Sequence, residues 1–348
     1  MPRIGISLLT LVPGIVGGSE TYARELCRQL AETGRHQYDA FVPTIAADAA
    51  DGLETRVVGS YRASRTIPGR LAAMAHGSLS RRVRRELELD RLDAIHFPLS
   101  VMIPEVRRPP AATTILDVQH EFLPEFFSRA ELAYRRVVYK RTARASRRVI
   151  TISEHARETL IERFGLEPER VRAIYFGVDH SLFRPSEEPR GDFLLYPANR
   201  WPHKNHERLF AAAERLGRRL VLTGSGHEGK PAPPFVDVRG RVPGDELVRL
   251  LQTCAALVFP SLYEGFGQPP LEAMACAAPV AVADIPPLRE VCGDAASYFD
   301  PSDPDAIAAG IEEALRRGGD AGPARAAGFT WERCAREHDA VYTALLAD

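Results

Sequence analysis

The chain has 348 residues, 45% of them hydrophobic and 26% charged, a length that suits two domains better than a single core. A formal net charge of −1 offers no bulk attraction to nucleic acid or anionic lipid. The five cysteines are scattered and lack C-x-x-C spacing, which argues against a disulfide framework or a zinc site. No run approaches the ~18 apolar residues of a membrane-spanning helix, and the first apolar run is too short for a signal peptide. We therefore expect a cytoplasmic protein.

Short β-rich runs alternate with amphipathic helical patterns through the first half of the chain. Strands are predicted over residues 3–12, 38–43, 93–97, 112–118 and 148–153. Helices are predicted over residues 19–32, 70–89, 130–145 and 154–164, the first of them capped by Ser19 with Glu20 in its first turn. This alternation predicts a parallel sheet with right-handed crossovers.

A glycine turn, Gly14-Ile15-Val16-Gly17-Gly18-Ser19-Glu20, closes the first strand and opens the first helix. Glycines at such a turn let the backbone approach a ligand closely, and a helix N-terminus favours an anion. From the pattern alone, a tight turn that serves only packing is equally compatible.

A polar, proline-rich segment, Pro185-Ser186-Glu187-Glu188-Pro189-Arg190-Gly191, has the composition of a linker. A second alternating series follows it, with strands predicted over residues 193–196, 219–223, 236–238, 257–259, 280–282 and 297–299. The fold class predicted is α/β, with two doubly wound domains over residues 1–184 and 185–330 and a ligand cleft between them. A last helix is predicted over residues 331–348.

One dinucleotide-type motif is rejected. Residues 224–229 fit G-x-G-x-x-G after a strand, but Lys230-Pro231-Ala232-Pro233-Pro234 follows at once and forbids the helix that this motif opens. A nicotinamide-dependent oxidoreductase is therefore disfavoured. His203 and His206 lie close together in sequence, but no nearby carboxylate or cysteine completes a metal site, so no metal is expected.

The most informative segment is Pro260-Ser261-Leu262-Tyr263-Glu264-Gly265-Phe266-Gly267-Gln268-Pro269-Pro270-Leu271-Glu272. An apolar strand precedes it and helix-forming residues end it, so backbone N–H groups of the loop and a helix end suit a phosphate. The carboxylates of Glu264 and Glu272 would repel that phosphate and are better explained as acceptors for sugar hydroxyls. A nucleotide sugar offers both groups.

This segment resembles the signature of the retaining glycosyltransferases of family 4, which have the GT-B fold of two Rossmann-like domains facing a cleft. The resemblance implies that Glu264 contacts the transferred sugar and that Glu272 binds the nucleotide ribose. It also implies that the loop formed by Gly265, Phe266, Gly267 and Gln268 holds the diphosphate. Gln268 departs from the family, which more often has an apolar residue there.

The resemblance extends to three other segments. Lys204 occupies the position of a lysine that binds the donor diphosphate, whereas Asn199 stands where the family has an arginine, so either Arg200 replaces it or one cation is missing. Gly17 and Gly18 match the glycine loop of the first domain. In residues 114–121, Asp117 matches a His-Asp pair near the reacting sugar, Leu116 stands at its histidine position, and His120 follows as a catalytic candidate. The last helix is expected to return to the first domain.

The activity implied is transfer of a hexose, with retention, from a nucleoside-diphosphate sugar to a saccharide or lipid-linked acceptor in surface polysaccharide or glycoconjugate synthesis. GDP-mannose is favoured as donor and a UDP-sugar comes next; no cofactor or metal is expected. Three alternatives stay open: a non-enzymatic nucleotide-sugar-binding protein, a GT-B epimerase and a GT-B phosphorylase.

Two basic runs without acidic residues, within residues 62–85 and 135–148, lie in the first predicted domain. Taken singly, each is better explained as a solvated helix face. Their occurrence in one domain also fits peripheral contact with anionic lipid at the inner face of a membrane, close to a lipid-linked acceptor.

Overall fold

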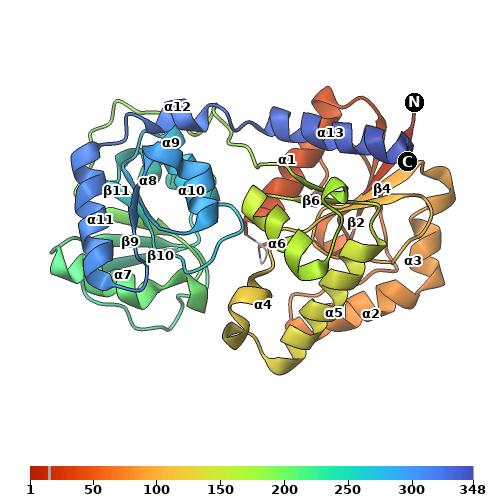
Figure 1. The fold of residues 1–348 in the computed structure, drawn as a ribbon, viewed down its shortest axis with the longest axis horizontal. Helices are drawn as coiled ribbons and strands as arrows, with labels where there is room; N and C mark the ends of the chain where they lie inside the picture. The colour runs from red at the N-terminus through yellow and green to blue at the C-terminus, as the bar shows by residue number, and fades with distance from the viewer. Residues whose placement is uncertain (15–16, 348) are drawn as a thin grey trace. The chain divides into compact units, whose positions relative to one another are not determined.

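The structure, a computed structural model, describes residues 1–14 and 17–347 and divides into two units (Figure 1). Unit 1 comprises Met1–Gly177 and Trp331–Asp348, and unit 2 comprises Val178–Thr330. Each unit contains one sheet in which every pair of neighbouring strands is parallel. Within the described ranges, no helix has both the length and the apolar character needed to cross a membrane.

Unit 1 has a seven-stranded sheet in the order β3-β2-β1-β4-β5-β6-β7. Its strands are β1 Arg3–Ser7, β2 Gln37–Val42, β3 Glu54–Val57, β4 Ala94–Phe97, β5 Ala111–Thr114, β6 Arg148–Thr151 and β7 Val171–Ala173. Its helices are α1 Gly18–Thr33, α2 Ile67–Leu79, α3 Arg81–Glu86, α4 Gln119–Phe122, α5 Arg129–Ala145, α6 Glu154–Phe164 and α13 Trp331–Ala347. Helices α1 and α13 pack together on one face of the sheet, and α2, α3 and α5 lie on the other (Figure 1).

Unit 2 has a six-stranded sheet in the order β10-β9-β8-β11-β12-β13. Its strands are β8 Leu194–Pro197, β9 Leu220–Thr223, β10 Val236–Gly240, β11 Ala256–Phe259, β12 Val280–Ala283 and β13 Ser297–Phe299. Its helices are α7 His206–Arg215, α8 Gly244–Thr253, α9 Gln268–Ala275, α10 Pro286–Cys292, α11 Pro304–Arg317 and α12 Gly322–Ala326. Helices α7 and α11 pack on one face of this sheet, and α8, α9 and α10 cover the other (Figure 1).

The boundary between the units lies earlier than the 184/185 position predicted from the linker composition. Val178 pairs with Thr330 in an isolated parallel bridge, and its N–H donates to the Phe329 carbonyl at 3.1 Å. These bonds bring residues 178–184 into unit 2. The two points at which the chain passes between the units are therefore adjacent.

Several predicted elements differ from the structure. Helix α1 begins at Gly18 with Gly17 as its N-cap, not Ser19, because Gly17 takes a φ of 54° that glycine adopts without strain. The helix predicted over residues 70–89 is broken at Ser80, where the backbone is extended and the side chain accepts the Val83 N–H. The strand predicted over residues 112–118 ends at Thr114. Strand β3 was not predicted.

A fully buried polar network joins α13 to the sheet of unit 1. The Tyr342 hydroxyl lies 2.8 Å from His96 Nδ1, and His96 Nε2 lies 2.8 Å from Thr114 Oγ1. The Tyr22 hydroxyl lies 2.9 Å from the same threonine and 2.8 Å from His338 Nε2. Burial lowers the pKa of His338 to about 4 and that of His96 well below its usual value, so both rings are neutral at neutral pH.

Tyr342→Phe is expected to destabilise unit 1 by about 1–3 kcal/mol, because it leaves a buried imidazole nitrogen without its partner. The measurement is the change in urea midpoint of the unfolding transition. Tyr61→Phe is the matched control, since Tyr61 is also buried but no hydrogen bond of its hydroxyl is found among the described residues. Equal loss of stability in the two variants would contradict the assignment.

Candidate donor-sugar site

Unit 2 brings Lys204 and Glu264 together at the point where its strand order reverses. That point lies between β8 and β11, and ligands of doubly wound sheets bind outside the carboxyl ends of the strands there. Lys204 Nζ donates to Glu264 Oε1 at 2.6 Å, and the two side chains are only 12% and 13% exposed. Two residues far apart in sequence thus form a shielded ion pair at the expected position for a ligand.

Asn205 fixes the geometry of this pair. Its backbone has a φ of 59°, which asparagine tolerates better than most residues. Its side-chain Nδ2 donates to the carbonyls of Pro260 at 3.0 Å and Pro301 at 2.7 Å. Because the Leu262 N–H also donates to the His203 carbonyl at 2.8 Å, the Lys204 segment is held against the Glu264 segment. We did not predict this role for Asn205; an asparagine directly before a helix was the only signal.

The loop between β11 and α9 depends on Gly267. Its φ is 124°, and a Cβ there would lie 2.7 Å from Leu288 Cδ2, so the chain needs glycine at this position. Pro269 and Pro270 occupy the first turn of α9 and have no N–H to offer. The backbone donors for a phosphate in this segment must therefore come from residues 265–268, within which Phe266 is buried against Phe329 with ring centroids 6.1 Å apart.

Glu272 lies one turn into α9, on the same face as Gln268. Gln268 Nε2 donates to Glu272 Oε1 at 3.1 Å, as the i, i+4 spacing allows. Burial raises the pKa of Glu272 to about 7 even though this hydrogen bond lowers it. The Glu272 carboxyl group therefore holds its proton more readily than an ordinary glutamate, whereas the Glu264 carboxylate has a lysine partner.

Asn199 and Arg200 make structural contacts in this state of the protein. Asn199 Oδ1 accepts hydrogen bonds from the Ser225 N–H at 2.8 Å and hydroxyl at 2.9 Å, which ties the β8 and β9 loops together. Arg200 pairs with Glu207 at 2.9 Å and donates to the Pro231 carbonyl at 3.0 Å. Donor binding by Asn199 and Arg200 remains a prediction, and Arg200 would have to leave these partners to reach a phosphate.

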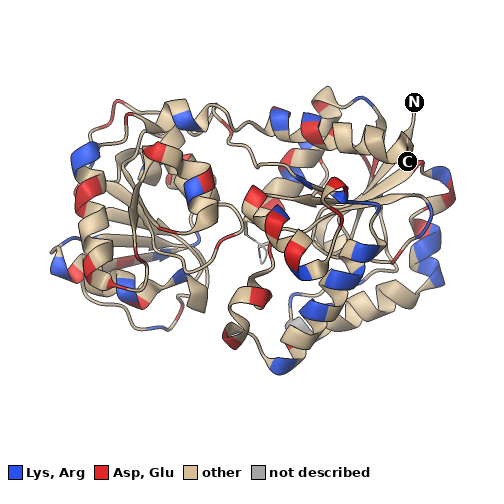
Figure 2. Cartoon of the chain, viewed as in Figure 1, with Lys and Arg blue, Asp and Glu red and all other residues tan. Residues whose placement is uncertain are grey.

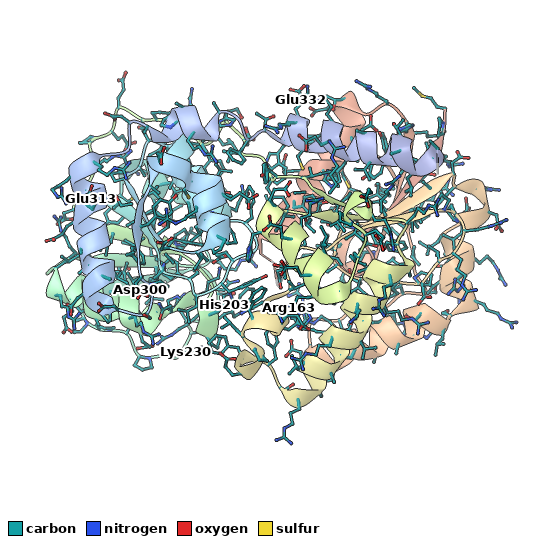
Figure 3. The ribbon with its side chains drawn as sticks, in the orientation of Figure 1. Arg163, His203, Lys230, Asp300, Glu313 and Glu332 are labelled. Carbon is teal, nitrogen blue, oxygen red and sulfur yellow. The ribbon has the colours of Figure 1, made fainter. Side chains whose placement is uncertain are left out.

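The two histidines beside Lys204 are buried; Figure 3 labels one of them, His203. Burial, helped by the Lys204 charge, lowers the pKa of His203 to about 3, and burial lowers that of His206 to about 3 as well. Both are neutral at physiological pH. Over residues 1–14 and 17–347, no group of three or more His, Cys, Asp and Glu side chains is arranged to hold a metal ion.

In unit 1 the strand order reverses between β1 and β4. Gly17 and Gly18 lie at this point, after β1 and at the start of α1. Gly14 is tied to this helix, because Glu20 Oε2 accepts the Gly14 N–H at 2.7 Å. A Cβ added at Gly18 would meet no described atom within 4 Å. Ile15 and Val16 of this motif lie outside the described residues.

Asp117 and His120 follow β5 in unit 1. Asp117 Oδ1 accepts the N–H of Gln119, the first residue of α4, at 3.1 Å. His120 is completely buried against Tyr139, and neither ring nitrogen has a hydrogen-bond partner among the described residues. Burial lowers the pKa of His120. The catalytic role of both residues stays a prediction, and α4 would have to move for His120 to contact an acceptor.

Comparisons with known proteins give one consistent result. Residues 16–182 match the family model described as Glycosyltransferase Family 4, and residues 180–326 match that of Glycosyl transferases group 1. The O-antigen chain mannosyltransferase RfbU of Salmonella typhimurium is 29% identical over 55% of this chain. The O-antigen chain mannosyltransferase B of Escherichia coli is 27% identical over 74% of it. The matches span 56% of the Salmonella protein, little more than half its length, and 76% of the E. coli protein.

Solved structures of low sequence identity share the fold. Sucrose-phosphate synthase from Thermosynechococcus elongatus superposes with a TM-score of 0.80 at 19% identity, over 100% of both chains. The Anabaena protein HepE, solved in complex with UDP and glucose, gives a TM-score of 0.72 at 16% identity, over 99% of this chain and 100% of its own. With both halves matched by the family models, the chain belongs to glycosyltransferase family 4 and has the two-domain, Rossmann-like GT-B fold.

Proposed function

We propose that this protein transfers a hexose from a nucleoside-diphosphate sugar to a saccharide or lipid-linked acceptor in surface polysaccharide or glycoconjugate synthesis. The observation that carries the proposal is the arrangement in unit 2. One cation, Lys204, and two carboxyl groups, Glu264 and Glu272, come from segments that leave one edge of the sheet. A cation suits a diphosphate, and carboxylates suit the hydroxyls of a sugar and a ribose.

Lys204 is proposed to stabilise the leaving nucleoside diphosphate. Negative charge develops on that group as the glycosidic bond breaks, and a preorganised cation in a shielded site stabilises it. Glu264 holds the ammonium group in position before the donor binds. When the diphosphate arrives, it competes for Lys204, and the Glu264 carboxylate becomes available to accept hydrogen bonds from the sugar.

The identity of the donor is proposed from the similar proteins. Two O-antigen chain mannosyltransferases are among them, which supports GDP-mannose as the favoured donor. The HepE structure with bound UDP-glucose supports a UDP-sugar as the second choice. Retention of the anomeric configuration is proposed from the family resemblance, with the leaving phosphate helping to deprotonate the acceptor and neither glutamate acting as a nucleophile.

Three further parts of the proposal concern the surroundings of the reaction. The donor diphosphate is handled without a metal ion, because Lys204 and the loop amides supply the stabilisation. Gly17, Gly18, Asn199 and Arg200 complete the donor contacts. The protein works in the cytoplasm, and the basic helices of unit 1 bring it to the inner face of the membrane.

A panel of UDP, GDP, dTDP, ADP and NAD tests the donor site by thermal shift, with and without EDTA. One nucleoside diphosphate at about 100 times its Kd should stabilise the wild type by roughly 2.7 kcal/mol. It should act equally in EDTA and should stabilise Glu272→Ala far less. Stabilisation by NAD alone, or by no nucleotide, would refute the proposed site.

Nucleotide affinity should rise with pH through the ionisation of Glu272. The raised pKa of about 7 means that the folded protein must release a proton before both carboxylate oxygens can accept the ribose hydroxyls. Binding should therefore be roughly tenfold weaker at pH 6 than at pH 8. Calorimetry on wild type and Glu272→Gln checks this, because the variant retains the titration of the phosphate but loses this contribution. Identical pH profiles would disprove the ribose assignment.

Glu264→Gln should separate binding from chemistry. The amide keeps the shape of the side chain but not its charge, so the nucleotide Kd should stay within a few fold while kcat falls by about 10²–10³. The readout is turnover with the donor identified by the thermal-shift panel and a crude acceptor extract. Glu188→Gln is the control, because Glu188 is 50% exposed and pairs with Arg249 outside the candidate donor site. Wild-type turnover of Glu264→Gln would exclude Glu264 from the reaction.

A further inference from the structure

Helix α2 has the composition of a buried helix but lies at the surface of unit 1. Its sequence, IPGRLAAMAHGSL, carries a single formal charge, at Arg70. Nevertheless, among the side chains of α2 that the structure describes, Ala73 is the only buried hydrophobic one, and Leu79 is 84% exposed. A helix that is apolar on most sides and remains uncovered marks a surface that another apolar group covers.

A groove of about 950 Å³ runs along this helix, at the upper end of the volumes that proteins use for small ligands. Its apolar lining comes from three parts of unit 1: α2, the segment after β4, and α5. These side chains are Leu71, Met74, Ala75, Leu79, Val101, Met102, Ile103, Tyr134 and Val138. The Tyr134 hydroxyl, the one aromatic hydroxyl of the lining, donates a hydrogen bond to Met74 Sδ at 2.8 Å. Both residues belong to the lining, so this hydroxyl already has a partner there.

The rim of the groove is cationic. Arg107 and Arg108 line it and are exposed, and neither is paired with a carboxylate within residues 1–14 and 17–347. Arg84 also lines it and donates to the Glu105 carbonyl at 2.9 Å. Glu105 is the one acidic residue of the lining, and its carboxylate is already paired with Arg141.

Arg107 and Arg108 also line a second pocket of about 870 Å³, whose lining contains six arginines and no acidic residue. The six are Arg107, Arg108, Arg144, Arg147, Arg148 and Arg170. Arg144 donates to the Phe164 carbonyl and Arg170 to three carbonyls around Ser146. These acceptors are neutral, and neither arginine forms an ion pair with a carboxylate in the part of the chain that the structure describes. Figure 2 shows α2 almost without charged residues, while Lys and Arg gather along α5 and α3.

This cationic pocket is separate from the predicted reaction site. It is lined by Ala111 and Arg148, the first residues of β5 and β6. It therefore lies at the amino edge of the parallel sheet, whereas Asp117, His120 and the glycine loop follow the carboxyl ends of the strands. A substrate at the carboxyl edge does not account for it.

We propose that this face of unit 1 binds single molecules of an anionic phospholipid. The hydrocarbon chain enters the groove between α2 and α5, and the phosphate binds Arg107 and Arg108 with the neighbouring arginines behind them. An apolar chain site combined with a basic cluster provides the two signals that stable membrane association requires. The inference deepens the membrane contact in the proposed function but needs no donor, so it stands or falls independently of the nucleotide site.

The first test is sedimentation of the full-length protein with vesicles of phosphatidylcholine containing phosphatidylglycerol, compared with pure phosphatidylcholine. Wild type should bind only the anionic vesicles, and Arg107→Glu/Arg108→Glu should weaken that binding at least about tenfold. Arg35→Glu/Arg91→Glu changes the net charge of the chain equally at exposed positions away from the groove and should bind like wild type. If both double variants lost vesicle binding equally, the loss would be explained by net charge alone, and the proposal would be overturned.

The second test examines the groove itself with a soluble probe, lysophosphatidylglycerol below its micelle concentration, followed by calorimetry. Ala75→Phe narrows the groove without changing charge and should weaken binding about tenfold, while glycerol 3-phosphate should not bind measurably. If glycerol 3-phosphate bound as tightly as the lysolipid, or if Ala75→Phe bound the lysolipid like wild type, no chain would occupy the groove. Each variant is first required to keep the wild-type melting temperature and nucleotide shift, so that misfolding and failure of the donor site are recognised separately.

Discussion

Parallel pairing throughout both sheets is the constraint on which the rest of the structure depends. It places the carboxyl ends of all strands of a sheet at one edge, so that loops far apart in sequence meet there. In unit 2 the reversal of strand order between β8 and β11 separates the helices on the two faces and leaves room between the loops. Lys204 and Glu264 fill this position, and Asn205 fastens the two loops that carry them.

The two glutamates of the donor site are in different electrostatic states although they lie in one short segment. Glu264 has the ammonium group of Lys204 as a partner, which compensates its charge in a shielded place. Among the described residues, the Glu272 carboxyl group has a neutral amide as its hydrogen-bond partner, and burial raises its pKa to about 7 because desolvation disfavours the charged form. In the proposed function, Glu264 would exchange its lysine partner for the hydroxyls of the sugar, and Glu272 would ionise most easily when the ribose hydroxyls donate to it.

Much of this architecture could be predicted from the sequence, because buried parallel strands appear as short apolar runs between helical patterns. Strand β3 escaped prediction since most of its side chains are exposed and its sequence, ETRV, lacks such a run. The break at Ser80 was missed although Gly77 and Ser78 precede it, because helix-forming residues continue beyond it on both sides. The motif around Glu264 and Glu272 indicated the site, but the partners of Arg200 and the burial of His120 depend on side chains that only the fold brings near. No local pattern reports those contacts.

The discontinuity of unit 1 has a consequence for how the chain acquires its structure. Helix α13 follows the whole of unit 2 in sequence, yet Tyr342 and His338 complete the polar network around His96 and Tyr22. During synthesis, residues 1–177 therefore leave the ribosome before His96 Nδ1 and the Tyr22 hydroxyl have their partners from α13. Residues 178–330 form a continuous segment that can fold as soon as it has emerged. Unit 2 can thus complete its fold before unit 1, because unit 1 needs α13 to complete its buried polar network.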